Sequence, residues 1–182
     1  MRFGRWLSSW LRRRSGRAGE VVPLHTVRPV LDAADIHSGP RLVAHPLMVG
    51  ERGPMAAALA GAQLPTDDID EPSRLFWRFD TVDDVPVGFG GLEICGDAAL
   101  VHSIVTLPPV RDRGIGSAIV EALETEAGLH LCRDCYLLTS EVGFFERLGY
   151  VACDSAAVPK AIRDAKSFAT RPASLLAMSK RL

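Results

Sequence analysis

Hydrophobic and polar positions change their period along the chain, and these changes predict an alternation of strands and helices. Residues 75–80 and 85–95 are rich in β-branched and aromatic residues, which is typical of strands. Gly96-Asp97 follows as a two-residue turn and predicts a hairpin with a strand over 98–107. Beyond the hairpin the apolar spacing becomes helical over 116–129.

Further elements are predicted on both sides of this centre. A first strand spans 42–49, and Pro46 favours a sheet edge for it, because proline cannot donate to a strand ladder. Gly53-Pro54 starts a helix that runs to Gly61, and a short helix capped by Thr66 or Asp67 follows in a loop. The C-terminal part is predicted to contain a strand at 135–139, a helix at 142–148, a short strand at 150–153, a helix at 158–168 and a closing strand at 174–180.

This element order predicts an α/β (α+β) fold with a mixed central sheet and helices on both faces. With 182 residues, 47% of them hydrophobic, the chain suits one compact domain and an appendage. We place the domain at residues 41–182. Residues 1–40 are predicted to form a basic, aromatic leader and a linker that are poorly ordered.

The leader combines Trp6, Leu7, Trp10 and Leu11 at helical spacing with surrounding arginines. Two interpretations are open: a short interfacial helix that contacts an anionic membrane, or a loosely attached leader. The pattern is brief and ends in an arginine cluster, so we favour the loosely attached leader over membrane contact by residues 1–20.

Composition narrows the functional classes. The formal net charge is −1, whereas a general nucleic-acid binder needs a surplus of Lys and Arg, so no nucleic-acid partner is expected. No apolar run approaches the ~20 residues of a membrane span, and no cleavable signal is evident. Cys132-x-x-Cys135 lacks the further ligands of a zinc site, so we expect two buried thiols, no metal, and a cytoplasmic protein.

The sequence carries most chemical information between the strand that ends at Leu107 and the helix that follows. Pro108-Pro109 breaks the strand, and Arg111-Asp112-Arg113-Gly114-Ile115-Gly116 opens directly into the helix. N–H groups at a helix N-terminus have no intrahelical partner and carry a partial positive charge. Glycines allow a phosphate to approach these groups closely, so the loop predicts a pyrophosphate site. It is neither a Walker A loop nor a dinucleotide-binding fingerprint, because the required Gly-Lys-Ser/Thr and third glycine are absent.

These residues resemble the GNAT superfamily of acetyl-CoA-dependent N-acetyltransferases. Arg111 to Gly116 matches the family signature Gln/Arg-x-x-Gly-x-Gly/Ala at every defined position. Phe144 to Tyr150 is similar to the family's later Phe-Tyr-x-x-x-Gly-Phe segment. The resemblance implies a GNAT fold with a splayed strand pair, acetyl-CoA as co-substrate without a metal, and transfer of the acetyl group to the amine of a small molecule.

The resemblance also implies which residues hold the cofactor. The backbone of Ile104, Val105 and Thr106 would pair with the pantetheine arm, and Phe144 and Phe145 would pack against the cofactor. Phe145 stands where many members have a tyrosine that protonates the leaving thiolate, so no general acid is assigned, and Tyr150 is expected in the core. The pyrophosphate would be held by Arg111, Asp112, Arg113, Gly114, Ile115, Gly116 and Ser117.

The hairpin register suggests candidates for proton transfer. If Gly96-Asp97 is the turn, Glu93 pairs with Leu100 and Gly91 pairs with His102. Glu93 and His102 then point from the same face and could accept a proton from a substrate ammonium, directly or through water. The alternative is that the two polar groups only satisfy each other. By position, Thr139 and Ser140 are candidate substrate contacts.

A narrower resemblance links the chain to GNAT proteins encoded with arsenic-resistance genes. It rests on segments outside the cofactor motif: Gly91-Leu92-Glu93, Gly96 to Leu100, Tyr136 to Thr139, Phe144 to Tyr150, Pro159-x-Ala161-Ile162 and Pro172-Ala173-Ser174. The last of these follows Arg171, where a cysteine is common. This likeness implies an amino-acid-like or organoarsenical acceptor. A different class also remains open, a catalytically weak acetyl-CoA-binding sensor module. A monomer or a homodimer is expected.

Overall fold

A computed structural model of this chain describes residues 39–110, 114–169, 172 and 174–182. The predicted leader up to residue 38 and the loop residues Arg111, Asp112 and Arg113 therefore lie outside the described residues. No helix in the described part is both long and apolar enough to cross a membrane.

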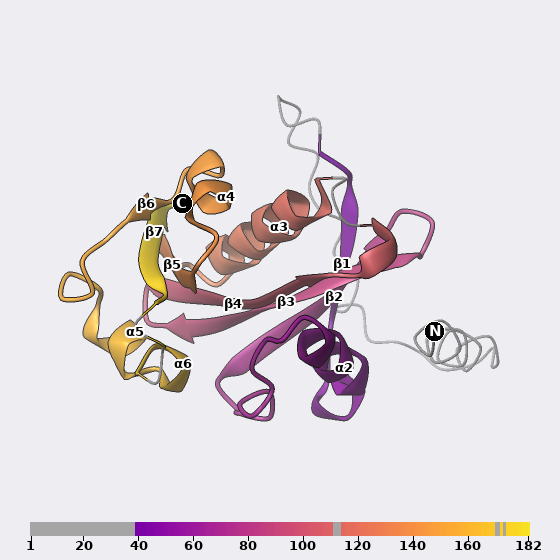
Figure 1. Cartoon of the computed structure of the whole chain (residues 1–182), viewed down its shortest axis with the longest axis horizontal. Helices are drawn as coiled ribbons and strands as arrows, with labels where there is room; N and C mark the ends of the chain where they lie inside the picture. The colour runs from indigo at the N-terminus through magenta and orange to yellow at the C-terminus, as the bar shows by residue number, and fades with distance from the viewer. Residues whose placement is uncertain (1–38, 111–113, 170–171, 173) are drawn as a thin grey trace.

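The described strands form a seven-stranded sheet in the order β1-β2-β3-β4-β5-β7-β6 (Figure 1). The first four strands make an antiparallel meander, β5 runs parallel to β4, and β7 is antiparallel to both β5 and β6. β1 is an edge strand, as the proline predicts. The strands are β1 (Leu42–Pro46), β2 (Arg74–Thr81), β3 (Pro86–Cys95), β4 (Ala98–Thr106), β5 (Asp134–Thr139), β6 (Val151–Ala152) and β7 (Leu176–Arg181).

Helices cover both faces of this sheet, as predicted. The long helix α3 (Ile115–Leu129) packs on one face, where Ile119 and Leu123 are buried against Phe79 and Leu92. Helix α4 (Val142–Arg147) lies on the same side (Figure 1). The opposite face is covered by α2 (Gly53–Gly61), α5 (Lys160–Asp164) and α6 (Lys166–Ala169).

Three predicted elements differ from the structure. The predicted helix at 158–168 is two short helices, because Ala165 adopts an extended conformation with ψ 132° between α5 and α6. The short helix after Thr66 is wrong: residues 67–70 form turns, and the Ile69 carbonyl accepts a hydrogen bond from Arg52 instead. The first strand ends at Pro46 and gives way to a 3₁₀ turn, η2 (Val49–Glu51), in which the Glu51 N–H bonds to the Met48 carbonyl at 2.8 Å.

A bulge and a splay shape the centre of the sheet. Phe89 pairs with Val105 and Gly91 pairs with His102, so β4 has one residue more than β3 between these pairs. Within the bulge Ser103 has a φ of 54°, in the left-handed region. β4 pairs with β5 only from Ala98 to Leu100, and beyond that point the two strands no longer bond to each other. The predicted splayed strand pair is therefore present.

Predicted core residues are buried as expected. Cys132 and Cys135 are both buried and carry free thiols, and burial raises the pKa of Cys135 to about 12. Tyr150 is 1% exposed and belongs to the core under α3, where burial raises the pKa of its hydroxyl. These groups are neutral packing residues at physiological pH.

Candidate active site

A cavity of about 930 Å³ lies where β4 and β5 diverge. This size is in the range of small-molecule and cofactor sites. Its walls are the bulged half of β4, the first turn of α3, the end of β5 and helix α4, with Ala62, Leu64 and Leu175 closing it from other segments. Most of the predicted site residues therefore meet around one cavity.

The first turn of α3 forms one end of this cavity. The first intrahelical hydrogen bond runs from the Ala118 N–H to the Gly114 carbonyl at 3.1 Å, so the N–H groups of residues 115–117 precede the ladder. Gly114 has a φ of 74°, which suits glycine, and it lines the cavity with Gly116 and Ser117. The Ile115 side chain is buried in the core, so only its backbone could reach a ligand.

The bulged half of β4 forms the adjoining wall. Ile104, Val105 and Thr106 all line the cavity. No described strand pairs with this edge of β4 beyond Leu100, so its backbone groups can bond to an extended ligand. Such a ligand would take the place of a neighbouring strand.

Helix α4 brings aromatic rings to the opposite wall. Phe144 and Phe145 both line the cavity and meet edge to face at 4.9 Å between ring centres. Phe144 also contacts the first turn of α3, since a Cβ at Gly116 would lie 3.4 Å from its Cζ atom. The side chain at position 145 carries no proton donor, so an acid is absent at this position.

The two predicted substrate contacts lie just before α4. Thr139 and Ser140 both line the cavity. The Thr139 hydroxyl accepts a hydrogen bond from the Glu141 N–H at 2.8 Å, so it also fixes the chain where α4 begins. Ser140 is exposed and is freer to contact a ligand.

The predicted register of the central hairpin is confirmed, with Glu93 opposite Leu100 and His102 opposite Gly91. The structure brings His102 to the cavity wall, but Glu93 is not among the lining residues. Glu93 instead accepts a hydrogen bond from the Ser73 hydroxyl at 3.0 Å and lies 3.8 Å from the Arg74 guanidinium. Glu93 and His102 therefore share one face of the sheet, but only His102 lines the cavity.

His102 is held in a tight and electropositive environment. Its ring packs edge to face on Phe76 at 5.2 Å, and its Nδ1 atom lies 3.1 Å from the Ser103 hydroxyl, with which it shares a hydrogen bond. Burial, followed by the charge of Arg74, lowers the pKa of His102 from 6.5 to about 3. The imidazole is therefore uncharged at neutral pH and resists protonation.

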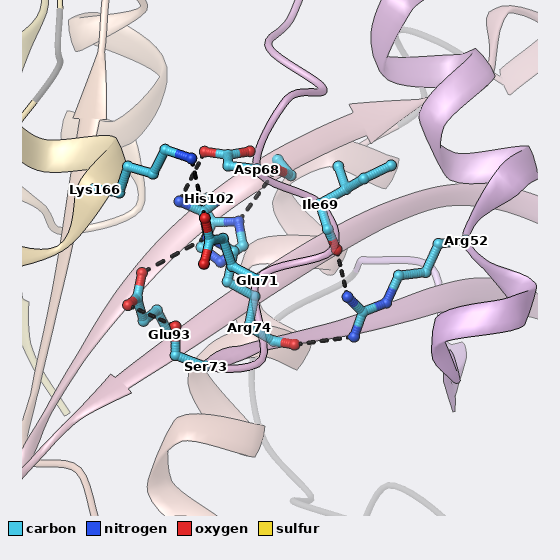
Figure 2. A network of polar contacts seen from close by, with 10 residues as sticks. Arg52, Asp68, Ile69, Glu71, Ser73, Arg74, Glu93, His102 and Lys166 are labelled. Carbon is cyan, nitrogen blue, oxygen red and sulfur yellow. Dashed lines mark hydrogen bonds and ion pairs between the residues drawn. The ribbon is translucent and has the colours of Figure 1, made fainter.

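A polar network surrounds Arg74, next to His102 (Figure 2). The buried Arg74 guanidinium contacts Asp68 at 2.8 Å as well as Glu93. Arg52 donates hydrogen bonds to the carbonyls of Ile69 and Arg74 and lies over the Phe76 ring. At the surface, Lys166 of α6 pairs with Glu71 at 3.0 Å.

Several lining residues could not be identified from the sequence. Ala62, Leu64 and Leu175 come from loops that lie far along the chain from the glycine motif, and loops carry no periodicity to reveal which way they face. Glu141 and Arg147 flank the two phenylalanines and also line the cavity. A basic residue three positions after Phe144, on the same helix face, was the one available signal.

One group of side chains in the described residues has the spacing of a metal site: His45, Asp80 and Asp84, whose ligand atoms lie within 4.8 Å of one another. The Asp80 carboxylate is already bound at both oxygens by Arg78, at 2.7 and 2.5 Å. This guanidinium supplies the positive charge that a cation would otherwise supply, so the group is satisfied as a buried ion pair.

Comparison with known proteins identifies the family that part of this chain matches. Residues 72–152 match the family model described as acetyltransferase (GNAT) domain. This segment covers the meander from β2, the glycine motif, α3, β5, α4 and β6. No curated protein matches the chain in sequence.

Solved structures share the fold at low sequence identity. The Mycobacterium tuberculosis protein Rv2747, in complex with CoA, is 18% identical over 77% of this chain and 99% of its own, with a TM-score of 0.62. N-acetylglutamate synthase from Neisseria gonorrhoeae, complexed with coenzyme A and N-acetyl-glutamate, is 15% identical over 78% of this chain but 35% of its own, with a TM-score of 0.64. A GNAT family acetyltransferase from Elizabethkingia anophelis with acetyl-CoA bound is 14% identical over 78% of this chain and 98% of its own, with a TM-score of 0.58.

Together these findings confirm the predicted GNAT fold, and residues 72–152 match a GNAT acetyltransferase domain. They do not bear on the arsenic-resistance branch.

Proposed function

We propose that this GNAT-type domain binds acetyl-CoA in the cavity between β4 and β5 and transfers its acetyl group to the amine of a small molecule. The observation that carries the proposal is the convergence of three features on one cavity: the N–H groups at the start of α3 that precede the helical ladder, the edge of β4 that no described strand pairs with beyond Leu100, and the Phe144 ring. CoA or acetyl-CoA is present in the similar structures from M. tuberculosis, N. gonorrhoeae and E. anophelis, which supports the same cofactor here.

In this proposal each wall holds one part of the cofactor. The N–H groups of residues 115–117, with Arg111, Asp112 and Arg113 beside them, bind the pyrophosphate, because a helix N-terminus attracts anions. The backbone of Ile104 to Thr106 pairs with the pantetheine amides. Phe144 and Phe145 pack on the arm.

The reaction is then a direct transfer. The neutral amine nitrogen attacks the thioester carbonyl carbon, the carbon–sulfur bond breaks, and CoA leaves as a thiolate. The proton lost by the nitrogen reaches the thiolate through water, because Phe145 has no proton to give. Alignment of the two reactants supplies most of the acceleration.

His102 and Glu93 take different parts in this proposal. His102 lines the cavity as an uncharged ring that can hydrogen-bond to the acceptor amine and orient it. Glu93 is bound by Ser73 and Arg74, so we assign it a positioning role rather than that of the proton acceptor. Thr139 and Ser140 contribute to the acceptor side.

The role of Glu93 is tested by Glu93→Gln, which keeps the shape and removes the charge. A positioning role predicts a raised KM for the amine with kcat little changed. A base would instead lower kcat and kcat/KM together and move the pH dependence toward the pKa of the free amine.

The acceptor is a small amine, and the narrower resemblance supports an amino-acid-like or organoarsenical compound. The function is tested by following thiol release from acetyl-CoA with a panel of amines that includes such compounds, beside calorimetric titration of acetyl-CoA. Thiol release that depends on the amine is expected. Tight binding of acetyl-CoA without release on any amine would contradict transfer and favour a sensor module.

A further inference from the structure

The acceptor side of the cavity rests on a buried cation that no part of the proposed reaction uses. Arg74 begins β2 and is 2% exposed. Its guanidinium contacts two carboxylates from different segments, Asp68 in the loop between α2 and β2 and Glu93 in β3. A buried charge needs such partners, because a charge removed from water is costly unless it is paired.

Asp68 connects this cation to the cavity wall. The loop between α2 and β2 spans residues 62–73, and its first part supplies Ala62 and Leu64 to the lining. Asp68 is itself buried and lies 2.8 Å from Arg74, so the ion pair ties the loop to the sheet. Arg52 fixes the same loop through the Ile69 carbonyl, and Lys166 fixes it through Glu71.

His102 lies next to the same cation. Phe76, Gly91 and His102 form one row across β2, β3 and β4, and Arg74 and Glu93 form the adjacent row on the same face. The imidazole leans over Gly91, since a Cβ at that position would lie 2.6 Å from its Cε1 atom. Figure 2 shows the Arg74 guanidinium between Asp68, Glu93 and His102.

We infer that Arg74 is a positioning residue for the acceptor amine: it anchors the wall that carries Ala62 and Leu64 and keeps a cationic charge off the His102 ring. The inference rests on the proposed function. An uncharged ring can accept a hydrogen bond from the amine and does not repel a substrate that arrives as an ammonium ion. The charged groups that surround the ring are Arg74 from β2, Glu93 from β3 and, behind Arg74, Asp68.

Removal of the Arg74 charge should make the His102 ring easier to protonate. In Arg74→Met, Asp68 and Glu93 would face the imidazole without a cation between them, which favours its protonated form. We expect the His102 titration midpoint, followed by NMR and assigned with His102→Gln, to rise by about two pH units or more. The KM for the amine at neutral pH should rise about tenfold or more, with the dissociation constant of acetyl-CoA unchanged within about twofold.

Two further variants separate charge from packing. Arg74→Lys keeps the cation and should hold the His102 midpoint low. Asp68→Asn releases the wall but leaves Arg74 in place, so it should raise the KM for the amine without raising the His102 midpoint. Lys160→Met removes an exposed cation that pairs with Asp164 of its own helix α5, and it is the matched control, for which neither quantity should change.

An unchanged His102 titration midpoint in Arg74→Met would overturn the inference. A loss of acetyl-CoA affinity as large as the rise in the KM for the amine would also overturn it. If Arg74→Met does not fold, Arg74→Lys and Asp68→Asn decide: a high His102 midpoint in the lysine variant, or an unchanged KM in the asparagine variant, would overturn it. Absence of turnover in the wild-type protein on every amine would instead contradict the proposed function, because the NMR titration does not depend on turnover.

Discussion

The two halves of the cavity are built from different parts of the polypeptide. The half assigned to acetyl-CoA consists mainly of backbone: the first turn of α3, two glycines and the unpaired edge of β4. The acceptor half consists of side chains: His102 of β4, Thr139 and Ser140 at the end of β5, and Ala62 and Leu64 from the start of the loop between α2 and β2. The ion pairs of Arg74 with Asp68 and Glu93 lie next to His102 and this loop. A backbone site suits a ligand that every member of a fold uses, whereas side chains can vary with the acceptor.

The half of the cavity built from backbone should lose its affinity for acetyl-CoA when a side chain is added to it. Gly116→Val places methyl groups in the first turn of α3, where the phosphates are proposed to lie. We expect acetyl-CoA to bind about 100-fold more weakly or worse, because two or more charge-assisted hydrogen bonds are lost. Calorimetry measures this affinity.

Gly128→Val is the control for this experiment. It adds the same side chain to the last turn of the same helix, where nothing lies within 4 Å of an added Cβ. Its affinity for acetyl-CoA should equal that of the wild type. Normal affinity in a folded Gly116→Val protein would contradict the assignment of the cofactor half.

The acceptor half should bind the amine less well when its side chains are displaced. A Cβ in Gly91→Ala would lie 2.6 Å from His102 and 2.7 Å from Phe76, so both rings must shift. Overpacking of this kind costs about 1–3 kcal/mol of the free energy of unfolding. Chemical denaturation should show this loss, and the KM for the amine should rise while the affinity for acetyl-CoA remains normal.

Gly50→Ala, where an added Cβ meets nothing within 4 Å, is the matched substitution and should leave both properties unchanged. Wild-type stability in Gly91→Ala would show that the His102 ring is not held against this strand.

The buried imidazole should also make stability depend on pH. The pKa of His102 is about 3 in the folded protein against 6.5 as the ordinary value, so the unfolded chain binds more protons between these values. The free energy of unfolding therefore falls as the pH decreases through this window, by at most about 1.4 kcal/mol per pH unit from this group. Urea denaturation between about pH 4.5 and 7 should show that the free energy of unfolding depends less steeply on pH in His102→Gln than in the wild type. An identical slope in the two proteins would contradict a neutral, buried His102.

The smallest effect is expected at the position of the absent acid. Phe145→Tyr adds a hydroxyl to a ring that already lines the cavity. Acid–base catalysis commonly contributes about 10²–10⁴-fold, but a thiolate leaves readily without it, so we expect no more than a few-fold change in kcat. An acceleration of about two orders of magnitude would show that thiolate departure limits the natural protein.

The contrast between the halves also explains what the sequence could predict. The cofactor half lies on one continuous segment, so Gly114, Gly116 and the apolar period of α3 indicate it without knowledge of the fold. The hairpin turn at Gly96 fixed the register of Glu93 and His102 correctly. Register alone does not show that the neighbouring strand offers a cation, so the pairing of Glu93 with Arg74 was missed.

Other errors have the same origin in long-range contacts. The predicted helix after Thr66 has suitable capping residues, but Asp68 and the Ile69 carbonyl are bound by Arg74 and Arg52 from elsewhere in the fold. Tertiary contacts of this kind override local helix propensity. The wall residue Leu64 was not predicted for the same reason.

We propose that acetyl-CoA lies along β4 and against the first turn of α3. An NMR titration of the ¹⁵N-labelled full chain with acetyl-CoA tests it most directly, because amide shifts report contact residue by residue. We expect the largest changes at the amides of Ile115, Gly116 and Ser117 and of Ile104 to Thr106, with those of β1 and α6 unchanged. Changes centred on any other surface, with the amides of residues 115–117 unmoved at saturation, would contradict it.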